Sequence, residues 1–261
     1  MNSFVVLIVL VFAAFASATD YCDPKVCTIP PNPVYKHVAC GFNGEANKRC
    51  TGYIQLTDAQ KQLILDTHNK LRNKIASGQQ PGFKPAANMA TMKWNDELTY
   101  IATVNAFNCD FEHDKCRNTD DYKFSGQNLA RRGKSDDYPE DNWALEDSIN
   151  GWYAEVENAT QSDIDNFQGG TATRVIGHFT QVVSALTDNL GCAAVKYKYV
   201  KNGVEFKAVQ LTCNYSRSSL LTQKIYKSGK PGSECKTGTN PQYPALCSES
   251  EEYDPNEFIF Q

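Results

Sequence analysis

The sequence lacks the short motifs that mark several enzyme and binding classes. No Cys-x-x-Cys pair occurs, so neither a zinc knuckle nor a thioredoxin-like redox centre finds support. There is no His-Glu-x-x-His helix of a metalloprotease and no Gly-x-Ser-x-Gly turn of a serine hydrolase. The tripeptide Arg-Gly-Asp is also missing, which removes one route to integrin binding. We therefore expect a protein that is not an enzyme.

Long runs of one chemical character are equally scarce. A net charge of -4 without a long basic block argues against nucleic acid as a partner. The one long apolar run, from Phe4 to Phe15, is too short for a comfortable membrane span and leads to the small residues Ala16-Ser17-Ala18. We interpret residues 1–18 as a secretory signal peptide and expect a secreted, extracellular protein without a membrane span. The sequence does not indicate its oligomeric state.

Cysteines are abundant instead. All ten follow the predicted cleavage point, and an even number in an oxidising compartment favours five disulfides. Spacing alone leaves most pairings open. The exception is Cys192 with Cys213, because these residues end the two arms of a hairpin centred on Asn202-Gly203.

Hydrophobic periodicity predicts helices interleaved with a small antiparallel sheet. The clearest helix follows a capping-box pattern at Thr57 and Gln60 and stops at Gly78. His68 lies on its apolar face, and we interpret it as structural. Further helices are predicted over 94–109, 142–159 and 174–183, a short strand over 123–130, and the hairpin over 190–216. These elements indicate an α+β layered domain.

The remaining segments have little periodicity. Residues 19–55 form a Cys-rich N-terminal segment, which we expect to be irregular and ordered by crosslinks. Residues 217–261 look like a small disulfide-bearing appendix. The basic cluster Arg131, Arg132 and Lys134 is interpreted as a solvated loop.

Four segments place polar side chains near the ends of predicted elements. These side chains are His113, Gln127, Glu155 and His178. Two imidazoles and one carboxylate are the ligands that a catalytic zinc ion uses, with an open position for water. The alternative for each histidine is a hydrogen-bonded structural role. A Ser-His-acid arrangement through Ser125 or Ser184 would depend on geometry that sequence does not give.

The motifs "GHFTQVV", "CNYS", "HNKLR", "GQNLA" and "WNDEL" together resemble the CAP superfamily of cysteine-rich secretory, antigen 5 and pathogenesis-related proteins. The cysteines ahead of "HNKLR" are similar to the insect antigen 5 branch, and the last pair is similar to the tail of fly members. The likeness covers about Tyr21 to Ser216, and we place the CAP domain at residues 56–216. It implies a three-layer α-β-α sandwich.

The resemblance also implies a central cavity lined by His113, Gln127, Glu155 and His178. His113, His178 and Glu155 would be the ligands if a metal binds, and Zn or Cu could fill that role, although no cofactor is required. Gln127 stands where the family has a glutamate. We expect its amide to donate to Glu155 and to accept from a histidine. The implied disulfides are Cys22 to Cys40, Cys27 to Cys116, Cys50 to Cys109, Cys192 to Cys213 and Cys235 to Cys247.

From this resemblance we expect a non-catalytic secreted protein of the salivary or venom allergen type. It would bind small lipid or amphipathic ligands, or host proteins of immunity or haemostasis. The alternative is a metal-binding protein with Zn- or Cu-dependent hydrolytic or redox activity. Of the two glycosylation acceptors, Asn158 is expected to be accessible, whereas Asn214 adjoins Cys213 in a predicted strand.

Overall fold

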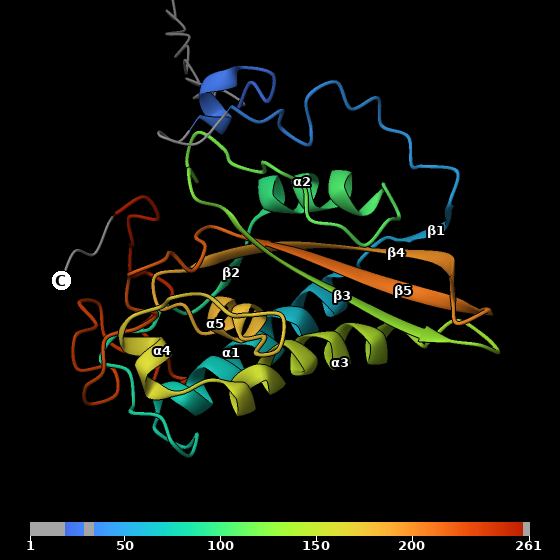
Figure 1. Cartoon of the computed structure of the whole chain (residues 1–261). Coiled ribbons are helices and arrows are strands. Elements are labelled where there is room, and N and C mark those ends of the chain that lie inside the picture. Colours follow the sequence, from blue (N-terminus) through green and yellow to red (C-terminus); the bar gives the residue numbers. More distant parts are fainter. Residues whose placement is uncertain (1–18, 29–33, 258–261) are drawn as a thin grey trace, which may run out of the picture.

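The computed structural model describes residues 19–28 and 34–257 of the chain (Figure 1). The predicted signal peptide, residues 1–18, lies outside these residues. Within the described ranges, none of the helices combines the length and the apolar character that crossing a bilayer requires.

A twisted sheet forms the middle layer. Its strands are β1 (Cys50–Ile54), β2 (Lys93–Trp94), β3 (Gly126–Lys134), β4 (Asn189–Lys201) and β5 (Val204–Tyr215). The hydrogen-bonded order is β1-β4-β5-β3, all antiparallel, and the short β2 pairs with β4 in parallel. Strand β3 therefore lies beside β5 along the whole length of β3.

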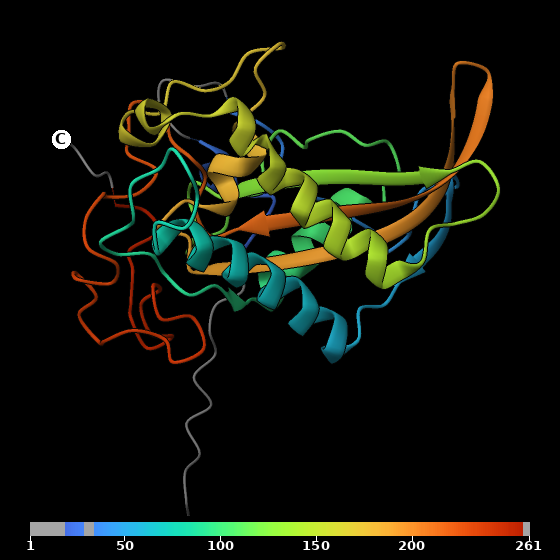
Figure 2. The ribbon, with the colours of Figure 1, turned by 90° about the horizontal axis from the view of Figure 1, so that it is seen from below.

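Helices cover both faces of this sheet. Helix α2 (Asp96–Ala106) lies on one face, whereas α1 (Asp58–Ala76), α3 (Asp141–Ala154) and α5 (Gly177–Val182) lie on the other (Figure 1). Figure 2 shows α1 and α3 running across that second face. The short elements are α4 (Gln161–Asp165) and the 3-10 helices η1 (Pro24–Cys27) and η2 (Glu155–Asn158). This arrangement confirms the predicted three-layer α-β-α sandwich.

Local signals in the sequence fix several element ends. Thr57 and Gln60 form the predicted capping box at the start of α1, and the Asn95 side chain caps α2 by accepting from the Leu98 amide at 2.9 Å. The β4–β5 turn places Asn202 and Gly203 at φ of 53° and 76°, the positive values that a two-residue hairpin turn needs.

The predicted basic loop after Ala130 is wrong, because β3 continues to Lys134. Residues 131–134 pair in register with residues 207–210 of β5. The Arg131 guanidinium lies 3.7 Å from the ring centroid of Tyr199 and 4.7 Å from that of Phe111. Strand pairing and aromatic stacking thus overrule the loop-like composition.

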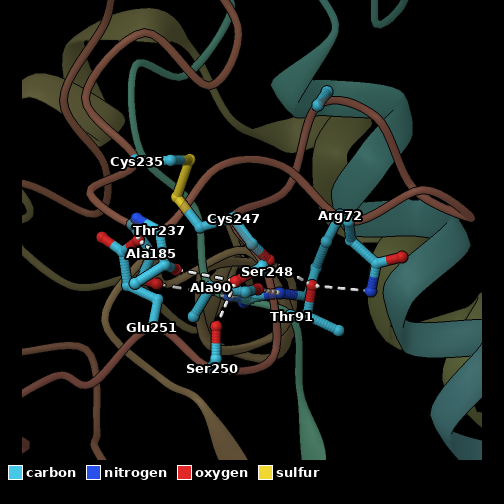
Figure 3. The surroundings of a disulfide bond; sticks show 12 residues. Arg72, Ala90, Thr91, Ala185, Cys235, Thr237, Cys247, Ser248, Ser250 and Glu251 are labelled. Carbon is cyan, nitrogen blue, oxygen red and sulfur yellow. Dashed lines mark hydrogen bonds between the residues drawn. A yellow bond between two sulfur atoms is a disulfide. The ribbon is translucent and has the colours of Figure 1, made fainter.

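The C-terminal segment is likewise more than an appendix. Leu246 and Cys247 are fully buried, and the Cys247 amide donates to the Met89 carbonyl at 2.8 Å. The Thr91 hydroxyl donates to the Cys247 carbonyl at 2.6 Å. Figure 3 shows the Cys235–Cys247 disulfide beside Ala90 and Thr91. Residues 217–257 therefore pack against the core next to α1 and contribute buried side chains to it.

A buried arginine ties together the irregular segments at this end. Arg72 of α1 is fully buried, and within the described residues its guanidinium donates only to backbone carbonyls. The acceptors lie at 2.8 to 3.3 Å and belong to Ala90, Val182, Ser184, Ala185 and Thr187. Burial lowers the pKa of Arg72 to about 10, so the group stays a cation at neutral pH.

The structure pairs the cysteines as the family resemblance implies. The five disulfides are Cys22–Cys40, Cys27–Cys116, Cys50–Cys109, Cys192–Cys213 and Cys235–Cys247. Cys192 and Cys213 are direct cross-strand partners, as the hairpin spacing predicts. Cys109 and Cys116 flank the loop that carries His113, and both anchor that loop to the N-terminal segment.

Candidate functional site

The four predicted site residues come from four different elements at one end of the sheet. His113 lies in the loop after α2, Gln127 in β3, Glu155 at the start of η2, and His178 in the first turn of α5. A cavity of about 280 Å³ opens there. Its lining includes His113, Gln127 and His178 but not Glu155, which reaches His178 from behind.

Glu155 holds both the ring and the backbone of His178. The Nδ1 of His178 donates to Glu155 Oε1 at 2.6 Å. The other carboxylate oxygen accepts from the backbone amides of His178, at 2.9 Å, and Phe179, at 3.1 Å. The Trp152 ring stacks on the imidazole with a centroid distance of 6.4 Å. Both oxygens of Glu155 are therefore engaged, and the His178 ring is fixed on two sides.

Gln127 holds the other imidazole. Its Oε1 accepts from His113 Nδ1 at 2.7 Å, and its Nε2 donates to Asp114 Oδ2 at 2.8 Å and to Asn214 Oδ1 at 3.0 Å. A carboxylate can only accept, so the orientation of the amide is settled by Asp114. The expectation that Gln127 accepts from a histidine agrees with this geometry. The expectation that it donates to Glu155 is wrong, because Asp114 and Asn214 take both donor positions.

Asp114 is a site residue that the sequence reasoning missed. Its side chain is almost fully buried and lies 2.9 Å from Arg117 Nε. It therefore supplies a negative charge beside the position where the family glutamate would stand. Its place directly after His113 in "EHDKC" is the one signal that could have pointed to it.

The surroundings favour a neutral His113. His113 is an exposed residue, but partial desolvation of its ring is the main cause that lowers its pKa. The positive charge of Arg117 and the neighbouring His178 act in the same direction. The hydrogen bond to Gln127 and the charge of Asp114 oppose this shift. With Nδ1 donating to Gln127, a neutral ring keeps a lone pair on Nε2.

The donor set for a metal ion is small. Among the residues that the structure describes, no group of three or more His, Cys, Asp or Glu side chains gathers closely enough to hold an ion. Glu155 already bonds through both oxygens, so the chain would offer chiefly the Nε2 atoms of His113 and His178. Metal binding by His113, His178 and Glu155 stays a prediction.

The two glycosylation acceptors lie in different environments. Asn158 is exposed at the end of η2, and its amide donates to the Val175 carbonyl at 3.3 Å. Asn214 is fully buried against Gln127. The environments agree with the expectation that Asn158 is the accessible acceptor, and its modification stays a prediction.

We expect the folded state to lose stability in mild acid because of His68. This residue is fully buried, donates from Nδ1 to the Ile64 carbonyl and accepts at Nε2 from the Tyr215 hydroxyl at 2.9 Å. Burial lowers its pKa from 6.5 to about 4. Between these two pH values, His68 is protonated in the unfolded chain but stays neutral in the folded chain. Stability therefore falls as the pH drops from about 6.5 to about 4.

The expected loss from His68 alone is about 3 kcal/mol, at 1.36 kcal/mol for each unit between the two pKa values. Urea unfolding at several pH values across this window measures it. A His68→Gln variant, which cannot titrate, should show a clearly shallower pH dependence. An unchanged slope in that variant would assign the acid effect to other groups, such as the buried His37, whose pKa is also lowered by burial.

Comparison with known proteins places this geometry in a family. The family model for cysteine-rich secretory proteins, CAP, matches residues 65–215. Venom allergen-1 of Aedes aegypti is 38% identical over 251 residues, covering 95% of this chain and 93% of the relative. An antigen 5 like allergen of Culicoides nubeculosus is 38% identical, covering 73% of this chain and 90% of the relative. The crystal structure of NaASP2 with Zn2+ superposes with a TM-score of 0.59 at 25% identity, covering 78% of this chain and 100% of that one. The chain belongs to the CAP family and is similar to its insect venom allergen and antigen 5 members.

Proposed function

We propose that this chain is a secreted, non-catalytic binding protein whose central cavity takes the polar end of a small amphipathic ligand. The observation that carries the proposal is that the described part of the protein bonds to one nitrogen of each histidine ring at the site and leaves the other nitrogen free. The Nδ1 atoms of His113 and His178 are held from behind by Gln127 and Glu155. Neither Nε2 atom has a hydrogen bond to any residue within the described ranges, which leaves two positions for a ligand.

The same arrangement argues against Glu155 as a general base. Both of its oxygens already bond to α5, and Gln127 is uncharged. A general base must reach the substrate with a free lone pair, and among the four site residues only the two histidine Nε2 atoms offer one. A metal-dependent hydrolytic or redox activity, the alternative, would take these same two atoms as metal ligands and would leave none of the four residues free as a base. Binding therefore has the stronger support.

The shape beside the cavity supports an elongated ligand. At about 280 Å³, the cavity lies just below the roughly 300 to 1,000 Å³ of common ligand sites. A second hollow of about 240 Å³ shares the lining residue Ser218 with it. We call this second hollow the side groove. Its lining includes the apolar or aromatic residues Tyr35, Phe124 and Leu220 and the cations Lys115 and Arg117. A polar head at the imidazoles and an apolar tail in the side groove would use both spaces.

The relatives indicate where such binding would act. Mosquito and midge relatives carry the names venom allergen and antigen 5 like allergen. We infer that this protein is secreted, as saliva or venom proteins are, and that it modulates host immunity or haemostasis. It would do so by capturing amphipathic mediators or by contacting a host protein directly.

Zinc is a second candidate ligand, because the solved relative NaASP2 is described with Zn2+. Imidazole nitrogens suit Zn2+ and Cu2+, and His113 and His178 would hold the ion here, with other positions left to water or ligand. Bound metal would supply a positive charge for an anionic ligand head. The roles of Gln127 and Glu155 would be to fix the two rings through Nδ1.

We expect a fluorescent polyene fatty acid to bind the purified protein, with the change in its emission as the measurement. Leu220→Glu should weaken binding at least tenfold, because it places a charge in the side groove. Leu221→Glu is the matched control, since Leu221 is adjacent in sequence, 63% exposed and absent from the groove lining.

Two outcomes would count against this proposal. Absence of binding by the parent protein removes the amphipathic ligand, and equal weakening by both leucine variants removes the side groove as its site. Metal content after dialysis against Zn2+ decides the second candidate separately. Equal content in the parent, His113→Ala and His178→Ala would show that the two imidazoles do not form the metal site.

A further inference from the structure

A chain of buried hydrogen bonds connects α1 to the cavity histidine on α5. His68 Nδ1 donates to the Ile64 carbonyl at 2.8 Å, so in the neutral ring Nε2 must accept. Nε2 accepts from the Tyr215 hydroxyl at 2.9 Å. The Tyr215 oxygen in turn accepts from Asn128 Nδ2 at 3.4 Å, and the same amide nitrogen donates to the His178 carbonyl at 3.1 Å. Every donor and acceptor direction in the chain is thereby determined.

The members of this chain are buried to a degree that is unusual for polar side chains. His68 and Tyr215 are fully buried and Asn128 is 1% exposed. Burying such groups costs stability unless each finds a partner, and here each partner is another member of the chain or a backbone carbonyl. Hydrophobic residues of the same size would fill this space without that requirement.

The chain ends at the backbone of a residue that lines the cavity. The ring of His178 is held by Glu155 and Trp152, but these contacts set only the side chain and the amide side of the residue. Asn128 holds the carbonyl side. Helix α5 spans only Gly177–Val182, so its own hydrogen bonds give it little rigidity.

We propose that His68, Tyr215 and Asn128 are positioning residues for His178, and that α1 fixes where this imidazole presents Nε2 to the cavity. The proposal rests on the proposed function, because it assigns His178 to the ligand site. It explains two sequence features together: the fully buried histidine of "HNKLR" and the second amide of "GQNLA". Gln127 accepts a hydrogen bond from the ring of His113. Its neighbour Asn128, whose side chain points to the other face of β3, donates to the carbonyl of His178.

Tyr215→Phe tests this proposal, with Tyr153→Phe as the matched control. Tyr153 is also a buried tyrosine; its hydroxyl donates to Gln80 at 3.1 Å, and its ring packs edge-on against Phe179 of α5. Both variants lose one hydrogen-bonded tyrosine hydroxyl, but only Tyr215→Phe interrupts the chain. The readout is hydrogen exchange of the His178 and Phe179 backbone amides by NMR, together with the tautomer of the His178 ring.

We expect these two amides to exchange at least tenfold faster in Tyr215→Phe than in Tyr153→Phe, while α2 amides are unchanged. Asn128→Ala should do the same, and combining it with Tyr215→Phe should add little, since both cut one chain. Asn128→Ala also serves if Tyr215→Phe does not fold. Equal exchange in the two tyrosine variants, or acceleration spread evenly over the protein, would overturn the proposal.

The measurement uses the protein without ligand, so its result is separate from that of the binding experiment. Local acceleration at α5 with no fatty-acid binding by the parent would support the positioning chain and contradict the proposed function. Fatty-acid binding by the parent with no local acceleration at α5 would support the proposed function and contradict the positioning chain.

Discussion

Replacing Gln127 by Glu is expected to lower the free energy of unfolding by about 2 to 4 kcal/mol at pH 7, as uncompensated buried charges do. The amide nitrogen of Gln127 donates to Asp114 at 2.8 Å, and both side chains are largely buried. A glutamate would place a second carboxylate against the first and would remove the hydrogen between them. A single change to the family glutamate is therefore expected to cost stability in this chain.

Two further measurements make this prediction specific. Lowering the pH should recover part of the lost stability of Gln127→Glu, because two close carboxylates share one proton and the pKa of one of them rises. The double variant Gln127→Glu with Asp114→Asn should also recover stability, since it exchanges carboxylate and amide. Urea unfolding of the parent, the single variant and the double variant at pH 7 and pH 5 measures these changes in stability. A stable Gln127→Glu without pH dependence would contradict the bond to Asp114.

Replacing Arg72 by Leu is expected to lower the free energy of unfolding by more than about 4 kcal/mol. Losses of this size occur when a buried hydrogen-bond network is broken. Leucine removes every donor that the carbonyls of Ala90, Val182, Ser184, Ala185 and Thr187 receive from this side chain. The Ser184 and Ala185 carbonyls also accept from backbone amides, so they keep a partner. The other three carbonyls would have no partner among the described residues and would carry their full desolvation cost. Arg72→Lys should also be severe, because an ammonium has three donors and lacks the planar fork.

Arg132→Leu provides the comparison for Arg72. Arg132 pairs with Asp147 at the surface, with side chains 24% and 44% exposed, so its loss should cost no more than about 1 kcal/mol. Thermal and urea unfolding of the three variants measures the difference. A parent-like Arg72→Lys would mean that charge rather than the fork geometry stabilises this end of the molecule.

Sequence patterns predicted what depends on neighbours along the chain. The capping box at Thr57 and the Asn202-Gly203 turn act within a few residues, and both appear in the structure as expected. The predicted strand ends too early, because the last residues of β3 are mostly charged and resemble a loop. They form a strand because they pair with β5, which is distant in the sequence.

The site could be predicted only in part for a related reason. The family resemblance located His113, Gln127 and His178, which line one cavity. It could not identify Asp114 as the partner of Gln127, because that contact depends on how the loop after α2 folds back. Arg72 is the last residue of the motif "HNKLR", but no pattern indicated that its side chain is buried. Its partners are backbone carbonyls, which every residue type has.

The contacts of the C-terminal segment also set the order in which the molecule can fold. Met89 and Thr91 follow α1 closely in the chain, yet both bond to Cys247 near the other end. The Met89 carbonyl accepts from the Cys247 amide, and the Thr91 hydroxyl donates to the Cys247 carbonyl across a separation of 156 residues. Closing so long a loop costs chain entropy before any contact offsets it, so such contacts form late and slowly. During synthesis, α1 emerges long before these partners exist. Its environment is therefore completed only after the last segment has been made and has closed over it.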